Sequence, residues 1–306
     1  MPIQNVALIG ANGNLGPYIL SALTSSPFTP FVLNRASSKS QYTNVQVLTV
    51  PDDLDPATIT PLLKSYSIDA LILAFEGALV EPAKKMIHAA FDAGVHRVIP
   101  ADFGSCDSAD PETVQLLPLM AGKQQVRELL IELARKERAE GVRAFTWTSL
   151  VTGHMFDWGL KGALLKFDVA KRKAYLIDGG DVKFSASNLE FIGRAAVRVL
   201  EREGETANRL LYVHSHWVTQ KEVLEVLERV MGERWERVVL DGKEVIEGER
   251  PKMLEGDHDA TEEIVAVHGL VASDWKGKEG FANELLGLEE EDLEQVIRRV
   301  VREMIQ

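Results

Sequence analysis

A glycine-rich turn between the first strand and the first helix most constrains the fold of this 306-residue chain. The apolar run 6–9 leads into Gly10-Ala11-Asn12-Gly13-Asn14-Leu15-Gly16, and residues 16–23 read as a helix. Glycines there permit a tight turn, a close approach to a pyrophosphate and close packing of helix on strand. The helix N-terminus offers unpaired N–H groups to phosphates. We therefore interpret the turn as a dinucleotide-binding loop, made of Gly10, Asn12, Gly13, Asn14, Leu15 and Gly16. The alternative is a strand-to-helix turn that binds nothing.

Short apolar runs alternate with helical patterns through the first half of the chain. This alternation is typical of a mostly parallel sheet with helices on both faces. The predicted fold class is therefore α/β, a doubly wound parallel sheet of the Rossmann type with a smaller α/β domain. The predicted strands are 6–9, 31–33, 45–50, 70–74, 97–99 and 144–148, and the longer predicted helices are 80–93 and 123–140.

The pattern loosens after residue 150, which sets the expected domain boundaries. Residues 1–150 are predicted to form the dinucleotide-binding domain, completed by about 183–215. Residues 151–182 and 216–306 are predicted to form a smaller substrate-binding or cap domain. The stretch 219–280 follows no pattern that we could interpret beyond a helix at 219–231, and residues 289–305 read as a last helix.

Charge and cysteine content exclude several classes of protein. Lys and Arg total 34 against 46 Asp and Glu, a formal charge of −12 that disfavours general nucleic-acid binding. One cysteine, Cys106, permits neither an internal disulfide nor a cysteine-rich zinc module. No stretch is long and apolar enough to cross a membrane. We expect a cytoplasmic protein that binds neither nucleic acid nor membrane.

The end of the second predicted strand indicates which dinucleotide would bind. An NAD site normally places an acidic residue about 20 residues after the loop. Here the strand ends at Asn34-Arg35, and Lys39 follows, with no acid nearby in the sequence. A guanidinium and an ammonium suit a 2′-phosphate, so we expect NADPH, bound by Asn34, Arg35 and Lys39. The alternative is a solvated basic loop.

Several motifs, in this order and spacing, resemble the NmrA-like branch of the atypical short-chain dehydrogenases. The chain is most similar to the isoflavone reductase and phenylcoumaran benzylic ether reductase group, especially its fungal members. It differs from that group at Asn12, where threonine is usual, and at Ala101-Asp102, where the plant enzymes have Ser-Glu. The motifs, besides the glycine loop and 33–35, are 98–104, 122–127, 148–153, 156–160, 185–188 and 192–194.

Proton transfer needs a group other than the usual tyrosine. None of the five tyrosines has a lysine four residues later, so the Tyr-x-x-x-Lys pair is absent. The resemblance implies that Lys123 lies beside the nicotinamide and serves as general acid or base. An ammonium partly buried against a cofactor loses hydration, which favours proton release near the working pH. A surface lysine in a first helical turn is the alternative.

The remaining candidates lie after strand ends and in the substrate-side segment that the resemblance indicates. Phe75 and Phe103 follow predicted strands, where ligands of such sheets bind, so both are predicted to lie near the cofactor. His154 is a second candidate for proton transfer, and a solvated loop histidine is its alternative. The predicted substrate-binding residues are Phe103, His154, Met155, Phe156 and Trp158, although an aromatic cluster is more often core. His214 and His216 lack a recognisable third metal ligand, and we predict no metal.

These observations predict an NADPH-dependent reductase. It would deliver hydride to a ketone, an enone or a benzylic centre of a small aromatic or polyketide-like molecule, with Lys123 moving the proton. A non-catalytic NADP(H) sensor of the NmrA type is the alternative from another class, and a non-redox isomerase or dehydratase is a third. The expected partner is a small-molecule substrate, and the protein itself is expected to be a monomer or homodimer.

Overall fold

The computed structural model describes residues 2–305, which form two compact units. Among the described residues, the first unit comprises 2–102, 118–150 and 192–211, and the second comprises 103–117, 151–191 and 212–305. The chain returns to the first unit at residues 192–211, a range that lies within the predicted 183–215. Residues 103–117, which the sequence pattern predicts for the first domain, lie in the second compact unit. The cofactor and substrate roles of the two units stay predictions.

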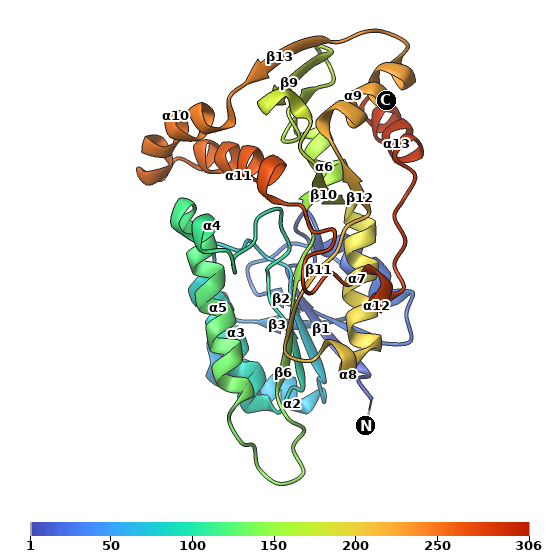
Figure 1. Cartoon of the computed structure of the whole chain (residues 1–306). Coiled ribbons are helices and arrows are strands. Elements are labelled where there is room, and N and C mark those ends of the chain that lie inside the picture. Colours follow the sequence, from blue (N-terminus) through green and yellow to red (C-terminus); the bar gives the residue numbers. More distant parts are fainter. Residues whose placement is uncertain (1, 306) are drawn as a thin grey trace. The chain divides into compact units, whose positions relative to one another are not determined.

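A seven-stranded sheet forms the centre of the first unit (Figure 1). Its order is β11-β6-β5-β4-β1-β2-β3, and the pairs from β3 to β6 are parallel. The order reverses between β1 and β4, as in a dinucleotide-binding fold. The predicted doubly wound α/β class is therefore confirmed. The strands are β1 Asn5–Ile9, β2 Thr29–Arg35, β3 Gln46–Val50, β4 Ala70–Leu73, β5 Arg97–Ile99, β6 Thr146–Val151 and β11 Arg209–Tyr212.

Helices cover both faces of this sheet. Buried side chains of α2, α3 and α5 share one core with the strands. On the other face α7 meets α1, because Gly193 has no side chain: a Cβ there would lie 2.5 Å from the Tyr18 carbonyl oxygen. Figure 1 shows α3 and α5 on the face opposite α7. The helices are α1 Gly16–Thr24, α2 Pro56–Ser65, α3 Val80–Ala93, α5 Pro118–Ala134, α7 Leu189–Glu201 and α8 Glu203–Thr206.

Helix α5 differs from the predicted helix 123–140 at both ends. It begins at Pro118, because proline suits a first helical turn, where its missing N–H costs nothing. It ends at Ala134, although the sequence stays rich in helix formers. Beyond it the Arg138 guanidinium donates to the carbonyls of Phe91 and Val95 and lies 4.5 Å from the Phe91 ring. These contacts form just beyond Ala134, where the chain turns away from the end of α5.

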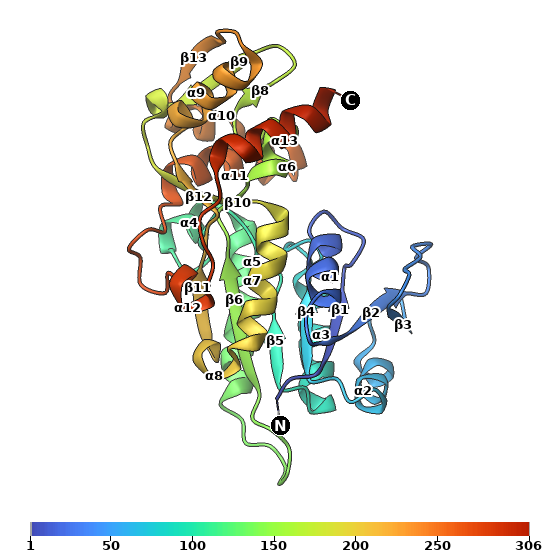
Figure 2. The same cartoon turned by 90° about the vertical axis from the view of Figure 1, so that its right-hand side faces the viewer.

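The second unit contains two small three-stranded sheets and the remaining helices. The sheet orders are β12-β10-β7 and β13-β9-β8. Helix α13 packs against α6 and α9 (Figure 2). The strands are β7 His154–Met155, β8 Phe167–Asp168, β9 Lys173–Ile177, β10 Phe184–Ser187, β12 His216–Val218 and β13 Glu236–Leu240. The helices are α4 Pro111–Leu116, α6 Phe156–Lys161, η1 Asp178–Gly180, α9 Gln220–Met231, α10 Gly242–Leu254, α11 His258–Ala272, α12 Asn283–Leu286 and α13 Leu293–Ile305.

Helices α10 and α11 fill the stretch that the sequence left without a pattern, and they pack against each other. Each begins after an aspartate that caps its first turn. The Asp241 carboxylate accepts from the Glu244 N–H, and the Asp257 carboxylate accepts from the Ala260 N–H. These two N-caps are the sequence signal that could have located the helices. Across residues 2–305, no helix has the length and apolar content of a membrane span.

Candidate active site

Two glycines of the loop are required by the fold itself. Gly10 has φ +87°, and a Cβ there would lie 2.6 Å from the carbonyl carbon of Ala74, at the end of β4. A Cβ on Gly16, the first residue of α1, would lie 2.7 Å from the Ala11 Cα. Gly10 therefore brings the loop against β4, and Gly16 brings α1 close to the turn.

Gly13 differs from Gly10 and Gly16, because the fold has room for a side chain at this position. It is exposed, and a Cβ there would make ordinary contacts, the nearest at 3.5 Å from the Gly10 carbonyl oxygen. Helix α1 begins after Leu15 without a side-chain cap among the described residues. An open glycine beside an uncapped helix N-terminus is the cradle that a pyrophosphate fits.

The two predicted cofactor loops are joined by side-chain hydrogen bonds. The Asn12 amide donates to the Ser40 hydroxyl at 3.0 Å, and the Asn34 amide donates to the Ser40 carbonyl at 3.4 Å. Asn12 comes from the glycine loop, while Asn34 ends β2. The structure therefore brings the glycine loop and the Arg35–Lys39 loop together, with both asparagines directed at the protein.

An acidic residue lies beside this basic loop, contrary to what the sequence suggested. Asp52, just beyond β3, accepts from the Ser37 hydroxyl at 2.5 Å and from the Ser37 N–H at 3.1 Å. These hydrogen bonds, aided by the nearby Arg35 charge, lower the pKa of Asp52, so its carboxylate stays ionised. Arg35 and Lys39 are both exposed. The acid was invisible in sequence because parallel pairing of β3 with β2, not chain proximity, places it there.

Lys123 is buried beside a second acid. Its side chain is 8% exposed, and its Nζ lies 3.9 Å from Oδ1 of Asp102, which follows β5. Arg127, one turn further along α5, places Nη1 3.3 Å from the other oxygen of Asp102. Because α5 begins at Pro118, Lys123 lies in the second turn, so the expectation of a cation in the first turn is wrong.

A pocket in the first unit includes Lys123 and the ends of β4 and β5. Phe75, a predicted cofactor residue, forms part of it, and its backbone nitrogen lies 2.8 Å from the Cβ position of Gly10. Glycine loop, Phe75 and Lys123 thus converge at the carboxyl edge of the sheet, where such folds bind ligands. The pocket is lined by Phe75, Gly77, Leu79, Ala83, Pro100, Ala101, Asp102, Lys123 and Val126.

The predicted substrate residues all lie in the second unit, with differing exposure. Phe156 is fully buried in the core of that unit and stacks on His216, with ring centroids 4.7 Å apart. Phe103 and His154 are also buried, whereas Met155 and Trp158 are half-buried. Burial lowers the pKa of His154 to about 4, so its ring is neutral near pH 7.

His214, one of the two histidines considered as metal ligands, contacts a serine of β10 and an acid that precedes the last helix. The His214 ring lies 2.9 Å from the Ser185 hydroxyl and 3.4 Å from a Glu290 carboxylate oxygen. The neighbouring Glu291 accepts from the Asn188 amide. Helix α13 starts only at Leu293, so these acids precede the helix and do not form its first turn.

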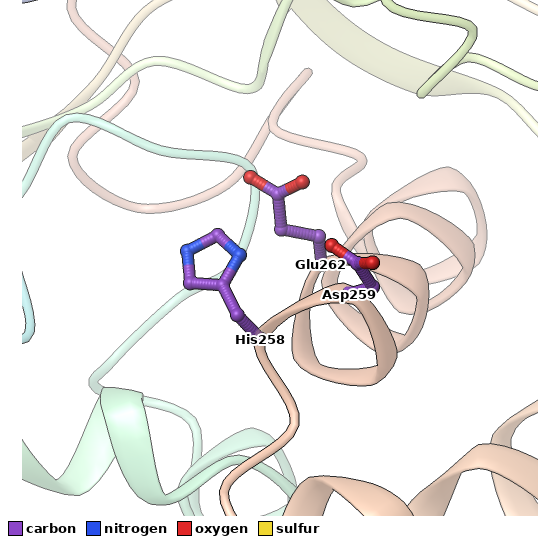
Figure 3. A group of neighbouring side chains, drawn as sticks. All are labelled: His258, Asp259 and Glu262. Atoms are coloured by element: carbon purple, nitrogen blue, oxygen red, sulfur yellow. The ribbon is translucent and has the colours of Figure 1, made fainter.

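One group of side chains has metal-ligand spacing among the described residues. Figure 3 shows His258, Asp259 and Glu262 on the first two turns of α11, and their ligand atoms lie within 4.8 Å of one another. Two of the three are exposed, and acids are favourable in a first turn without any ion. We therefore assign no metal to this group.

Comparison with known proteins identifies the family of this chain. A model of the NmrA-like family matches residues 2–255. The chain belongs to the NmrA-like family. The oxidoreductase poxI of Penicillium oxalicum is 30% identical over 311 residues, which cover 95% of this chain and 92% of that protein. The predicted family is confirmed, and the protein is an oxidoreductase.

Solved structures of reductases share the fold of this NmrA-like protein. An isoflavone reductase superposes with a TM-score of 0.76 at 19% identity, covering 97% of this chain and 99% of that one. A leucoanthocyanidin reductase from Vitis vinifera, solved with NADPH, gives 0.79 at 16% identity, with the same coverage of both chains. At these identities the likeness shows the fold alone.

Proposed function

We propose that the protein is an NADPH-dependent reductase that transfers hydride to an electron-poor carbon of a small aromatic or polyketide-like molecule. Lys123 is its general acid or base. The observation that carries the proposal is a lysine 8% exposed in a pocket at the carboxyl edge of the sheet, next to a glycine loop open to a pyrophosphate. The alternative, a lysine at the protein surface, would be exposed to solvent instead of buried.

The residues of the first unit fit NADPH. Gly13 and the uncapped start of α1 would hold the pyrophosphate, since nothing in the protein occupies that space. Arg35 and Lys39 would pair with the 2′-phosphate as exposed cations beside the loop. A leucoanthocyanidin reductase with the same fold was solved with NADPH, which supports NADPH as the cofactor. Phe75 would pack against the cofactor from the pocket wall.

The remaining chemistry falls to Lys123 and the pocket. Bound NADPH supplies the hydride and this protein orients it. The Lys123 ammonium would donate a proton to the substrate oxygen that becomes negative as the hydride arrives, and Asp102 would hold the ammonium in place. Apolar walls from Phe75, Leu79 and Pro100 would keep water away from the reacting atoms.

The substrate would be small and largely apolar. The half-buried side chains Met155 and Trp158 are proposed to contact it, together with Phe103. His154 would act as a neutral group, because its pKa of about 4 leaves it uncharged near pH 7. A ketone, an enone or a benzylic centre conjugated to an aromatic ring fits such a surface.

The test uses NADPH with a panel of aryl ketones, aryl enones and benzylic ethers, following the loss of NADPH absorbance. We expect the wild-type protein to reduce at least one class. Lys123→Ala should keep NADPH affinity and lose about 100-fold in kcat, the usual contribution of general acid catalysis. Lys136→Ala, at an exposed lysine beyond the end of α5, is the control. Unchanged turnover in Lys123→Ala would remove Lys123 from the mechanism, and no consumption with any acceptor would refute the substrate class.

A further inference from the structure

Lys123 lies in a slot that exists because residue 77 has no side chain. Gly77 belongs to the loop between β4 and α3, and it lines the same pocket. A Cβ on Gly77 would lie 2.6 Å from Cε of Lys123, 3.5 Å from its Nζ and 3.2 Å from the carbonyl oxygen of Ala101. Real Cβ atoms essentially never approach another heavy atom as closely as the first of these distances.

The requirement at Gly77 is steric and not conformational. Gly77 is not among the glycines with a positive φ, so its backbone could accept an L side chain. The atom in the way is the end of a flexible side chain, whereas the Ala101 oxygen would have to give by only a few tenths of an ångström. A methyl group at residue 77 would therefore leave the fold in place and displace the Lys123 ammonium.

A second glycine brings the lysine to this slot. Gly122 precedes Lys123 in α5, and a Cβ there would lie 2.7 Å from a Val80 methyl group at the start of α3. Gly122 thus lets α5 approach the start of α3, and the missing side chain of Gly77 leaves room for the Lys123 side chain. Asp102 lies beside the ammonium, and Arg127 contacts the second oxygen of Asp102.

We propose that Gly77 is a positioning residue of the reductase: its missing side chain forms the slot that holds the Lys123 ammonium at the pocket wall. The inference rests on the proposed role of Lys123 and adds the device that sets its position. A shift of about 1 Å in a catalytic group can cost about 100-fold in rate. A side chain at residue 77 would therefore lower turnover, although Gly77 itself does not contact the transferred proton.

The first experiment measures how exposed the Lys123 amine is, independently of turnover. The full-length wild-type protein, Gly77→Ala and the control Gly204→Ala are acetylated with an activated ester, and the rate at Lys123 is followed by peptide mass spectrometry. Gly204 lies in α8 of the same unit, with open space around it and no positive φ. We expect acetylation several-fold faster in Gly77→Ala, because the displaced lysine gains exposure, and the wild-type rate in the control. Equal rates in all three proteins would overturn the proposal.

The second experiment is a double-mutant cycle with Lys123→Ala, on the best acceptor of the panel. If Gly77 acts only through Lys123, Gly77→Ala lowers kcat and adds nothing once the lysine is gone, because coupled residues are not additive. A further loss in the double variant would show that residue 77 acts on something else, and would overturn the proposal. An unchanged kcat in Lys123→Ala alone would instead refute the proposed function, while the acetylation rates still report on the slot.

Discussion

The Nζ atom of Lys123 lies 3.9 Å from the Asp102 carboxylate, and both side chains are at least nine-tenths buried. Arg127 shares the same carboxylate from the next turn of α5. One buried anion therefore faces two buried cations, so its charge matters to stability and, under the proposed role of Lys123, to function. Burying a cation without a partner is costly, which makes Asp102 the member of the group whose removal has the largest expected effect.

Asp102→Asn should lower the unfolding free energy by about 3 kcal/mol, because two buried cations then lose their common partner. Denaturant unfolding measures the effect. Glu128→Gln, on the exposed side of the same helix, is the control and should stay within about 0.5 kcal/mol. Wild-type stability in Asp102→Asn would contradict the assigned pairing.

Gly13→Ala should separate ligand binding from folding. The fold does not need this glycine, since a Cβ there meets nothing closer than 3.5 Å. We expect an unchanged melting temperature for the free protein and a clear loss of NADPH affinity, because the methyl group occupies the space that the pyrophosphate would enter. Fluorescence titration with NADPH measures the affinity. Gly141→Ala would be a poor control because its φ is +82°, so Gly204→Ala is used again. Wild-type affinity in Gly13→Ala would place the pyrophosphate elsewhere.

The preference for NADPH over NADH should depend on the charges of Arg35 and Asp52. Arg35→Ala should weaken NADPH binding about tenfold, the loss expected for a charge-assisted hydrogen bond, and leave NADH binding nearly unchanged. Asp52→Asn should change the preference the other way, by about two- to fivefold towards NADPH, because an exposed carboxylate no longer faces the phosphate. The ratio of the two dissociation constants is the measurement. Lys64→Ala, an exposed lysine at the end of α2, should leave the ratio unchanged. Equal losses for both cofactors in Arg35→Ala would refute a 2′-phosphate contact.

Buried histidines should make the protein sensitive to mild acid. Burial lowers the pKa of His154 and of His216 to about 4, against about 6.5 in an unfolded chain. Below pH 6.5 these histidines take up protons in the unfolded state but not in the folded state. Their contribution therefore lowers stability as the pH drops from about 6.5 to about 4, and it does not change above that window. The loss is on the order of 3 kcal/mol for each histidine.

The measurement is the pH dependence of the urea midpoint. His154→Leu should flatten the slope between pH 6.5 and 4, because leucine takes no proton, and the slope is read independently of any change in absolute stability. His258→Leu, at an exposed histidine on α11, should keep the wild-type slope. An unaltered slope in His154→Leu would show that this ring is not buried in its neutral form.

Much of the first unit was predictable from local patterns. A glycine turn between an apolar run and a helix indicated the start of a parallel α/β fold, and the predicted strands 31–33, 70–74 and 97–99 overlap β2, β4 and β5. These features are readable because strand and helix periodicity, turn glycines and proline positions act within a few residues. The ends of α5 were not readable, because tertiary contacts of Arg138 accompany the end of the helix.

The sequence by itself determined the fold class and the glycine loop, and it predicted a role for Lys123. Tertiary structure decided what surrounds them. Asp52 reaches Ser37 through the pairing of β3 with β2, and Asp102 and Gly77 meet Lys123 where the ends of β5 and β4 approach α5. The physical reason is that charge pairing and steric room depend on distances in space, and residues 46 positions apart in the chain, such as Gly77 and Lys123, become neighbours only when the sheet has formed.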